Sequence, residues 1–163
     1  MKTRIAALLT ALTITFAALA TISFIPRASA QDSVYTALAS GSVPSATESN
    51  IYLLARIISA EARGEPYTGQ VAVGAVILNR IKHPSFPDTL SGVIYQEGAF
   101  TAIVDGQFNQ PISDSAYNAA RDALNGWDPT GGAIYYYNPA KTSNAFMHAR
   151  PIIVTIGAHR FCS

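Results

Sequence analysis

The segment "IYLLARIISAEARGEPYTGQVAVGAVILNRI", residues 51–81, contains the pattern that decides the expected fold. In its first half the apolar residues recur every three or four positions, which is the spacing of one helix face. The stripe predicts a helix that starts near residue 50 and turns this face toward the core. Its members are Ile51, Leu54, Ala55, Ile58 and Ala62.

Residues on either side of this stripe set the expected limits of the helix. Gly64 and Pro66 interrupt the pattern and predict its end. Ser49 or Asn50 is expected to cap its start, because short polar side chains accept hydrogen bonds from the first free amides of a helix.

Two further helices are predicted downstream. Residues 69–81 are apolar on nearly every side, which favours a central, buried helix with Thr68 as its cap. Residues 114–124 are expected to form the next helix, capped by Ser113 and ended by Gly126.

Short strands are predicted in the other segments of the domain. Asp105-Gly106, between apolar neighbours, predicts a hairpin turn. The segments "AIYYYNP" (133–139) and "PIIVTIGAHRF" (151–161) are rich in β-formers and are bounded by proline. The predicted class is α+β, a helical body with short antiparallel β-hairpins.

The first thirty residues have the pattern of a secretory signal peptide. Lys2 and Arg4 precede a long apolar run, and Ala28-Ser29-Ala30 supplies a small-residue cleavage site. The alternative is an uncleaved anchor, since residues 5–25 are long enough to span a bilayer. The cleavage site favours removal and a secreted product, so contact with the membrane would be transient.

Composition divides residues 31–163 into a leader and one domain. Residues 31–49 are rich in Ser, Thr, Ala and Gly without a period, and we expect a flexible leader. Residues 50–163 suit one small domain. Without the three bases of residues 1–30, eight Lys and Arg face ten Asp and Glu. This weakly acidic balance argues against a nucleic-acid partner.

The sequence gives little support for catalysis by a metal, a cysteine or a serine. His83, His148 and His159 form no local zinc-ligand pattern, and no cofactor or metal is expected. Cys162 stands alone, which excludes an internal disulfide and leaves a disulfide between molecules open. There is no G-x-S-x-G motif and no phosphate-binding glycine loop.

Carboxylates are the remaining candidates for catalysis. Glu61 lies beside the apolar stripe, in the last turn of its helix, where both burial and the helix dipole raise a carboxyl pKa. Such a group can give a proton to a glycosidic oxygen. On spacing alone a solvated helix-end glutamate is the commoner case. Glu65 precedes Pro66 in the turn and is expected to be structural. Tyr135 and its two tyrosine neighbours suit sugar rings or sheet packing.

Four segments together resemble the catalytic domain of the spore cortex-lytic enzymes, the SleB-type cell wall hydrolases. The resemblance covers residues 51–162, and the segments occur in the family's order. They are "ARIISAEARGEPYTGQVAVGAVILNRI" (55–81), "GVIYQEGAFTAIVDGQ" (92–107), "YYYNPAKTSNAFMHARP" (135–151) and "TIGAHRFC" (155–162).

The resemblance implies a lysozyme-like domain that acts on peptidoglycan glycan strands as a lytic transglycosylase. Cleavage between N-acetylmuramic acid and N-acetylglucosamine would leave 1,6-anhydro ends, in the spore cortex or the cell wall. By the same resemblance Glu61 is the catalytic acid and then base, and Glu65 is not the proton donor. Membership of the family segments assigns substrate binding to Thr101, Asp105, Tyr135 and Asn138.

Two other functions stay open at this stage. One is a hydrolysing muramidase or glucosaminidase in which Asp105 activates water as a second carboxylate. The other is a non-catalytic module that binds peptidoglycan. Longer family members carry a separate peptidoglycan-binding domain before the catalytic one. Here only residues 31–49 separate the predicted signal peptide from the helix that contains Glu61. We therefore expect targeting to the wall to come from the catalytic domain or from a partner protein.

Overall fold

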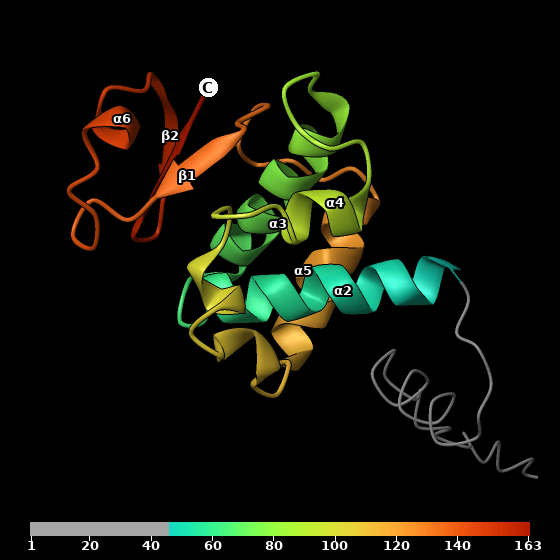
Figure 1. The fold of residues 1–163 in the computed structure, drawn as a ribbon. Coiled ribbons are helices and arrows are strands. Elements are labelled where there is room, and N and C mark those ends of the chain that lie inside the picture. Colours follow the sequence, from blue (N-terminus) through green and yellow to red (C-terminus); the bar gives the residue numbers. More distant parts are fainter. Residues whose placement is uncertain (1–45) are drawn as a thin grey trace, which may run out of the picture.

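The computed structural model describes residues 46–163, a helical body with a small antiparallel sheet at one end (Figure 1). The predicted signal peptide and most of the predicted leader lie outside these residues. Among the described residues, no helix is both long enough and apolar enough to cross a bilayer. The helices are α2 (Ala46–Glu61), α3 (Tyr67–Lys82), α4 (Leu90–Ile94), η1 (Thr101–Ile103), η2 (Gln107–Asn109), α5 (Asp114–Leu124) and α6 (Ala145–His148), and the strands are β1 (Tyr135–Tyr137), β2 (Ile152–Ile156) and β3 (His159–Cys162).

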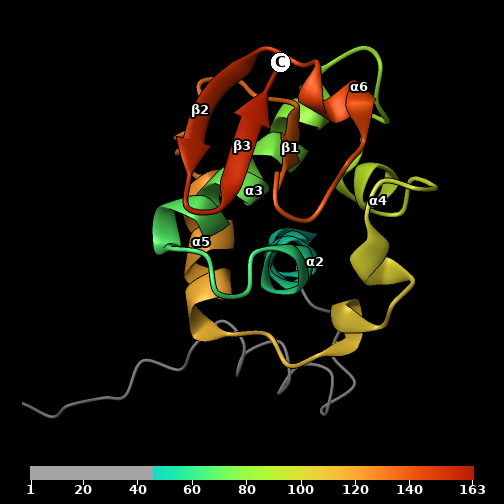
Figure 2. The ribbon, with the colours of Figure 1, turned by 90° about the vertical axis from the view of Figure 1, so that its left-hand side faces the viewer.

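Helix α2 runs through the middle of the molecule, and Figure 2, which looks along it, shows the other elements arranged around it. Its apolar stripe is buried, with Leu54 and Ile58 fully inaccessible to solvent. The helix begins at Ala46, so the prediction that Ser49 or Asn50 caps it is wrong, as is the flexible leader for residues 46–49. Residues 46–50 contain no glycine or proline, and Glu48 in the first turn interacts favourably with the helix dipole.

Helix α3 is buried over most of its length, as its composition predicts. It begins at Tyr67, and Pro66 occupies the capping position with no side-chain hydrogen bond, so the prediction of Thr68 as cap is wrong. Proline suits a helix start because its ring fixes φ near the helical value. The N–H group that it lacks would also have no partner within the helix there. Helix α5 follows its prediction: Ser113 Oγ accepts a hydrogen bond from the Ala116 amide.

The segment around Asp105-Gly106 contradicts the predicted hairpin. It forms two short 3₁₀ helices, η1 and η2, in place of strands. The Asp105 carboxylate accepts a hydrogen bond from the Gln107 amide, and Gly106 adopts a φ of 86°, so the pair turns the chain directly into η2. A two-residue hairpin of type I′ would need positive φ at both positions. Phe108 is buried against the core and holds the turn there.

The three strands form one antiparallel sheet in the order β1-β3-β2. Strands β2 and β3 form a hairpin around Gly157, inside the segment that the sequence predicts only as β-rich, and β1 pairs with the other edge of β3. Phe161 on the central strand is fully buried in the main core. The α+β class is therefore confirmed, with one hairpin plus a third strand.

Candidate active site

A cleft of about 660 Å³ opens where the ends of α2 and α3 meet β1, α6 and the segment 96–102. The segments are far apart in the sequence, and the helical body and the sheet each contribute one wall. Side chains that decide its chemistry are Glu61, Arg80, Phe86, Thr101, Tyr136 and Phe146.

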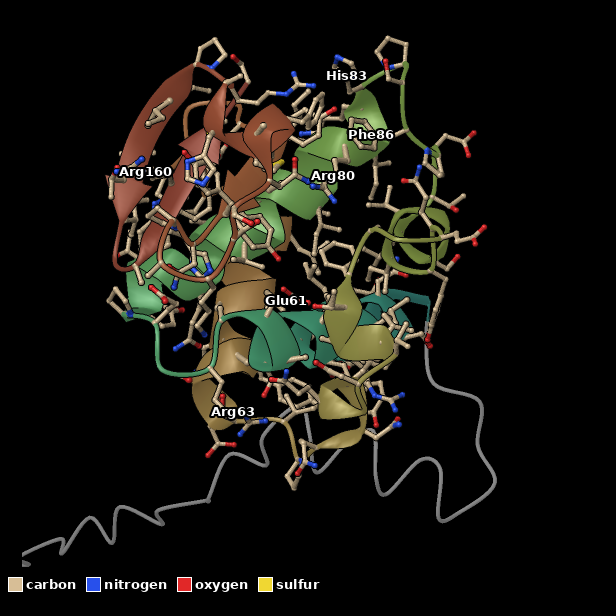
Figure 3. All side chains as sticks on the ribbon, turned by 60° about the vertical axis from the view of Figure 1, so that its left-hand side comes forward. Glu61, Arg63, Arg80, His83, Phe86 and Arg160 are labelled. Atoms are coloured by element: carbon tan, nitrogen blue, oxygen red, sulfur yellow. The ribbon has the colours of Figure 1, made fainter. Side chains whose placement is uncertain are left out.

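Glu61 is the last residue of α2, and its side chain points into the cleft from the helical body (Figure 3). Its neighbours Ala60 and Ala62 are buried, so the apolar stripe fixes which way the final turn faces. The Tyr136 hydroxyl donates a hydrogen bond of 3.1 Å to Glu61 Oε2. Within the described residues, the buried Oε1 atom has no hydrogen-bond partner.

The pKa of Glu61 is raised above the ordinary value of 4.5, chiefly by burial. The Tyr136 hydroxyl and the nearby Ala102 amide oppose this effect, because they favour the ionised carboxylate. Asp105 raises the pKa further through like charge, and Arg80 lowers it. The net result is a carboxyl group that holds its proton more tightly than a solvated glutamate does.

Arg80 faces the same cleft from α3 and is only 8% exposed (Figure 3). Its Nε donates a hydrogen bond of 2.8 Å to the Ile134 carbonyl. The guanidinium also lies 5.2 Å from the centroid of the Phe86 ring and 5.4 Å from that of Phe100. Burial lowers the pKa of Arg80, while the Coulombic attraction of Glu61 opposes the change. The arginine thus supplies a fixed positive charge close to the carboxyl group.

The structure brings four of the five predicted site residues to one cleft. Thr101, Tyr135 and Asn138 line it together with Glu61. Asp105 lies outside the lining and is exposed. Both its carboxylate oxygens accept hydrogen bonds from Gln107, which lower its pKa. Asp105 has the contacts of a turn residue.

The other charged residues near Glu61 in the sequence lie outside the cleft. Arg63 donates to the Pro111 carbonyl at 3.1 Å, and Figure 3 shows it well away from Arg80. Glu65 contacts the β2–β3 hairpin, where its Oε2 accepts a hydrogen bond of 3.0 Å from the Ala158 amide.

Sequence reasoning missed Tyr136, Arg80 and His159, all of which line the cleft. Arg80 could have been found, because a charged residue within an otherwise apolar helix demands a buried partner. No local signal connects Tyr136 to Glu61, 75 positions away.

Comparison with known proteins adds an independent finding. The family model described as Cell Wall Hydrolase matches residues 64–162. The chain belongs to this cell wall hydrolase family. The matched range begins at Gly64, so this match does not cover Glu61.

Relatives of this cell wall hydrolase domain include spore cortex-lytic enzymes. That of Bacillus cereus is 51% identical over 116 residues, which cover 71% of this chain and 45% of that protein. That of Oceanobacillus iheyensis is 52% identical over 116 residues, or 71% of this chain and 42% of that protein. The chain thus spans less than half the length of these curated relatives.

Two solved structures also match the cell wall hydrolase domain. The catalytic domain of the Bacillus cereus SleB protein is 50% identical with a TM-score of 0.68, covering 74% of this chain and 95% of that one. The catalytic domain of the germination-specific lytic transglycosylase SleB from Bacillus anthracis is 49% identical with a TM-score of 0.68, covering 74% and 100%. The resemblance to SleB-type hydrolases and the lysozyme-like fold are confirmed.

Proposed function

We propose that this domain is a lytic transglycosylase that cleaves the bond between N-acetylmuramic acid and N-acetylglucosamine in peptidoglycan, with Glu61 as its single acid and base. The observation that carries the proposal is the Glu61 carboxyl group, partly buried on a cleft and with a raised pKa. Membership of the cell wall hydrolase family and the likeness to a lytic transglycosylase domain support it.

The proposed reaction needs no water during the cut. Glu61 donates its proton to the glycosidic oxygen as the bond from that oxygen to the muramic acid C1 breaks. The C6 hydroxyl of the same sugar then attacks C1, and Glu61 takes up the hydroxyl proton. The new C1–O6 bond closes the 1,6-anhydro ring, and the carboxyl group is again protonated.

The cleft also offers groups that suit a sugar chain. Tyr135 and Phe146 present aromatic rings with centroids 5.9 Å apart, which can stack on the apolar faces of sugars. Thr101 and Asn138 add polar groups along the lining. We assign these residues to substrate binding, where they would orient the glycan strand over Glu61.

The first test is the Glu61→Gln variant, which keeps the size of the side chain and removes the proton. We expect its rate of product release from purified peptidoglycan to fall by at least about 100-fold, since general acid catalysis contributes roughly 10²–10⁴. The matched control is Asp88→Asn, an exposed loop carboxylate that should leave the rate unchanged. Near-normal activity of Glu61→Gln would exclude the assignment.

The chemical nature of the product separates the proposal from hydrolysis. Mass spectrometry should find anhydro ends, lighter by one water than the reducing ends that a muramidase or glucosaminidase leaves. Reducing ends together with an inactive Asp105→Asn variant would favour the two-carboxylate reaction, although Asp105 lies outside the cleft lining. Binding to insoluble peptidoglycan without soluble product would indicate a non-catalytic module.

The place of action is part of the same proposal. Export by the predicted signal peptide would bring the enzyme to the cell wall or the spore cortex, as the names of its relatives indicate for them. Parallel digestion of cortex and vegetative peptidoglycan, with products compared by mass, identifies the preferred substrate.

A further inference from the structure

Glu65 is held between two distant parts of the chain. It lies in the turn after α2, yet its Oε2 accepts the Ala158 amide, 93 positions away, at 3.0 Å. Gly157 has a φ of 58°, and a Cβ added to it would overlap the Glu65 carboxylate. The hairpin backbone is therefore closed tightly around this one carboxylate, which is 11% exposed.

The second oxygen of Glu65 faces a buried histidine. Glu65 Oε1 lies 3.4 Å from His159 Nδ1, a close contact without the alignment of a hydrogen bond. His159 begins β3 and lines the cleft. Burial lowers the pKa of His159, Glu65 raises it and Lys141 lowers it, so the ring favours its neutral form.

His159 in turn contacts the ring that holds Glu61. The centroids of the His159 and Tyr136 rings are 5.3 Å apart and the rings are perpendicular. Phe161 lies 5.9 Å from the same tyrosine ring. Since Tyr136 OH donates to Glu61, an unbroken series of contacts runs from Glu65 through His159 and Tyr136 to Glu61.

We propose that Glu65 and His159 are positioning residues, which act through the Tyr136 ring to keep its hydroxyl on Glu61 Oε2. Glu65 fastens the hairpin to the turn after α2, and His159 packs perpendicular to the Tyr136 ring and holds it in place. The carboxyl group is then presented to the cleft in one orientation. The inference deepens the proposed function and rests on it.

The consequence for Glu61 has a definite sign. A hydrogen bond to the ionised carboxylate lowers its pKa, so a displaced Tyr136 hydroxyl leaves Glu61 with a higher pKa. The other groups whose charge or dipole acts on Glu61 are the Ala102 amide, Asp105 and Arg80, and none of them contacts Glu65 in this series. Loss of Glu65 should therefore change the pKa of Glu61 only when the Tyr136 hydroxyl is present and can be displaced.

The test uses Glu65→Gln, which retains an oxygen for the Ala158 amide and removes the charge facing His159. We expect kcat to fall by about tenfold with KM unchanged, less than the roughly 100-fold cost of a 1 Å misplacement. The pKa of Glu61, followed by carbon-13 NMR of its carboxyl group, should rise. His159→Gln should shift it in the same direction, and Asp88→Asn should not.

The same titration in a Tyr136→Phe background separates positioning from simple scaffolding. Tyr136→Phe alone should raise the Glu61 pKa, and adding Glu65→Gln should then raise it no further. An additional rise in the double variant, or no rise in Glu65→Gln at an unchanged melting temperature, would overturn the proposal. If Glu65→Gln is destabilised, His159→Gln provides the same comparison. Because the NMR readout needs no turnover, an active Glu61→Gln would count against the proposed function alone.

Discussion

Opposing influences act on the Glu61 carboxyl group. Burial favours the neutral acid, while the Tyr136 hydroxyl and Arg80 favour the anion, and burial has the largest effect. Such a balance suits the proposed role of Glu61 as both acid and base. It also has a thermodynamic cost, because the folded protein disfavours the charged form that the unfolded chain accepts freely at neutral pH.

A stability measurement can detect this difference. The pKa of Glu61 in the folded protein lies above 4.5, so the folded protein binds this proton more tightly than the unfolded chain does. The stabilisation from this proton is complete below pH 4.5 and is lost as the pH rises through the pKa of the folded protein. The Glu61→Gln variant should therefore unfold at a higher urea concentration than wild type at neutral pH. Its free energy of unfolding should be larger by about 1 kcal/mol. The gain should shrink in acid, and a variant less stable than wild type at neutral pH would contradict this account.

At the scale of elements, three helices cross at one small residue. Gly74 lies in the buried part of α3, where an added Cβ would come within 2.9 Å of Ile58 Cδ1 and 3.1 Å of Ala123 Cβ. Those two contacts belong to α2 and α5. The absence of a side chain thus lets α3 pack closely against both neighbours, and this packing places Arg80, two turns further along, at the cleft.

Gly74→Val should push these helices apart. Overpacking a tight site typically costs about 1–3 kcal/mol, and we expect a loss of roughly 2 kcal/mol or more in the free energy of unfolding. Gly74→Ala is the matched comparison: it adds one carbon and gains helix propensity, so its loss should be smaller. Urea denaturation of both variants checks this, and equal stability of Gly74→Val and wild type would show that the crossing is not tight.

Across the whole molecule, the C-terminal strand is part of the interior. Strand β3 is central in the sheet, and its Cys162 is fully buried, although it is the penultimate residue. Burial also raises the pKa of its thiol, against the effect of Arg150 and Arg160. A buried, protonated thiol reacts slowly and does not reach a second molecule.

The Cys162 thiol should therefore report global unfolding. Native protein should react with a thiol-specific disulfide reagent far more slowly than protein in denaturant, and the native rate should rise with urea as the unfolded population grows. Non-reducing electrophoresis of the folded protein should show a monomer. Rapid labelling in native buffer, or a dimer that a reductant dissolves, would show that β3 opens locally or that the thiol is accessible.

Local spacing determined much of this protein. The apolar stripe of α2, the apolar run of α3 and the Ser113 cap of α5 predict the helical body, because periodicity and capping depend on neighbours within a few residues. The segments of α2 and α3 also carry part of the resemblance to the family, and it is this resemblance that singles out Glu61. Its position beside the apolar stripe predicts the burial that chiefly raises its pKa.

Only the tertiary structure decided the remaining features. The segment around Asp105 forms two 3₁₀ helices with Phe108 packed into the core, and Asp105 lies outside the cleft lining. The hydrogen bond from Tyr136 to Glu61 joins residues 75 positions apart. The hydrogen bond from the Ala158 amide to Glu65 joins residues 93 positions apart. Such contacts arise when the sheet packs against the helical body, and no spacing within one segment encodes them.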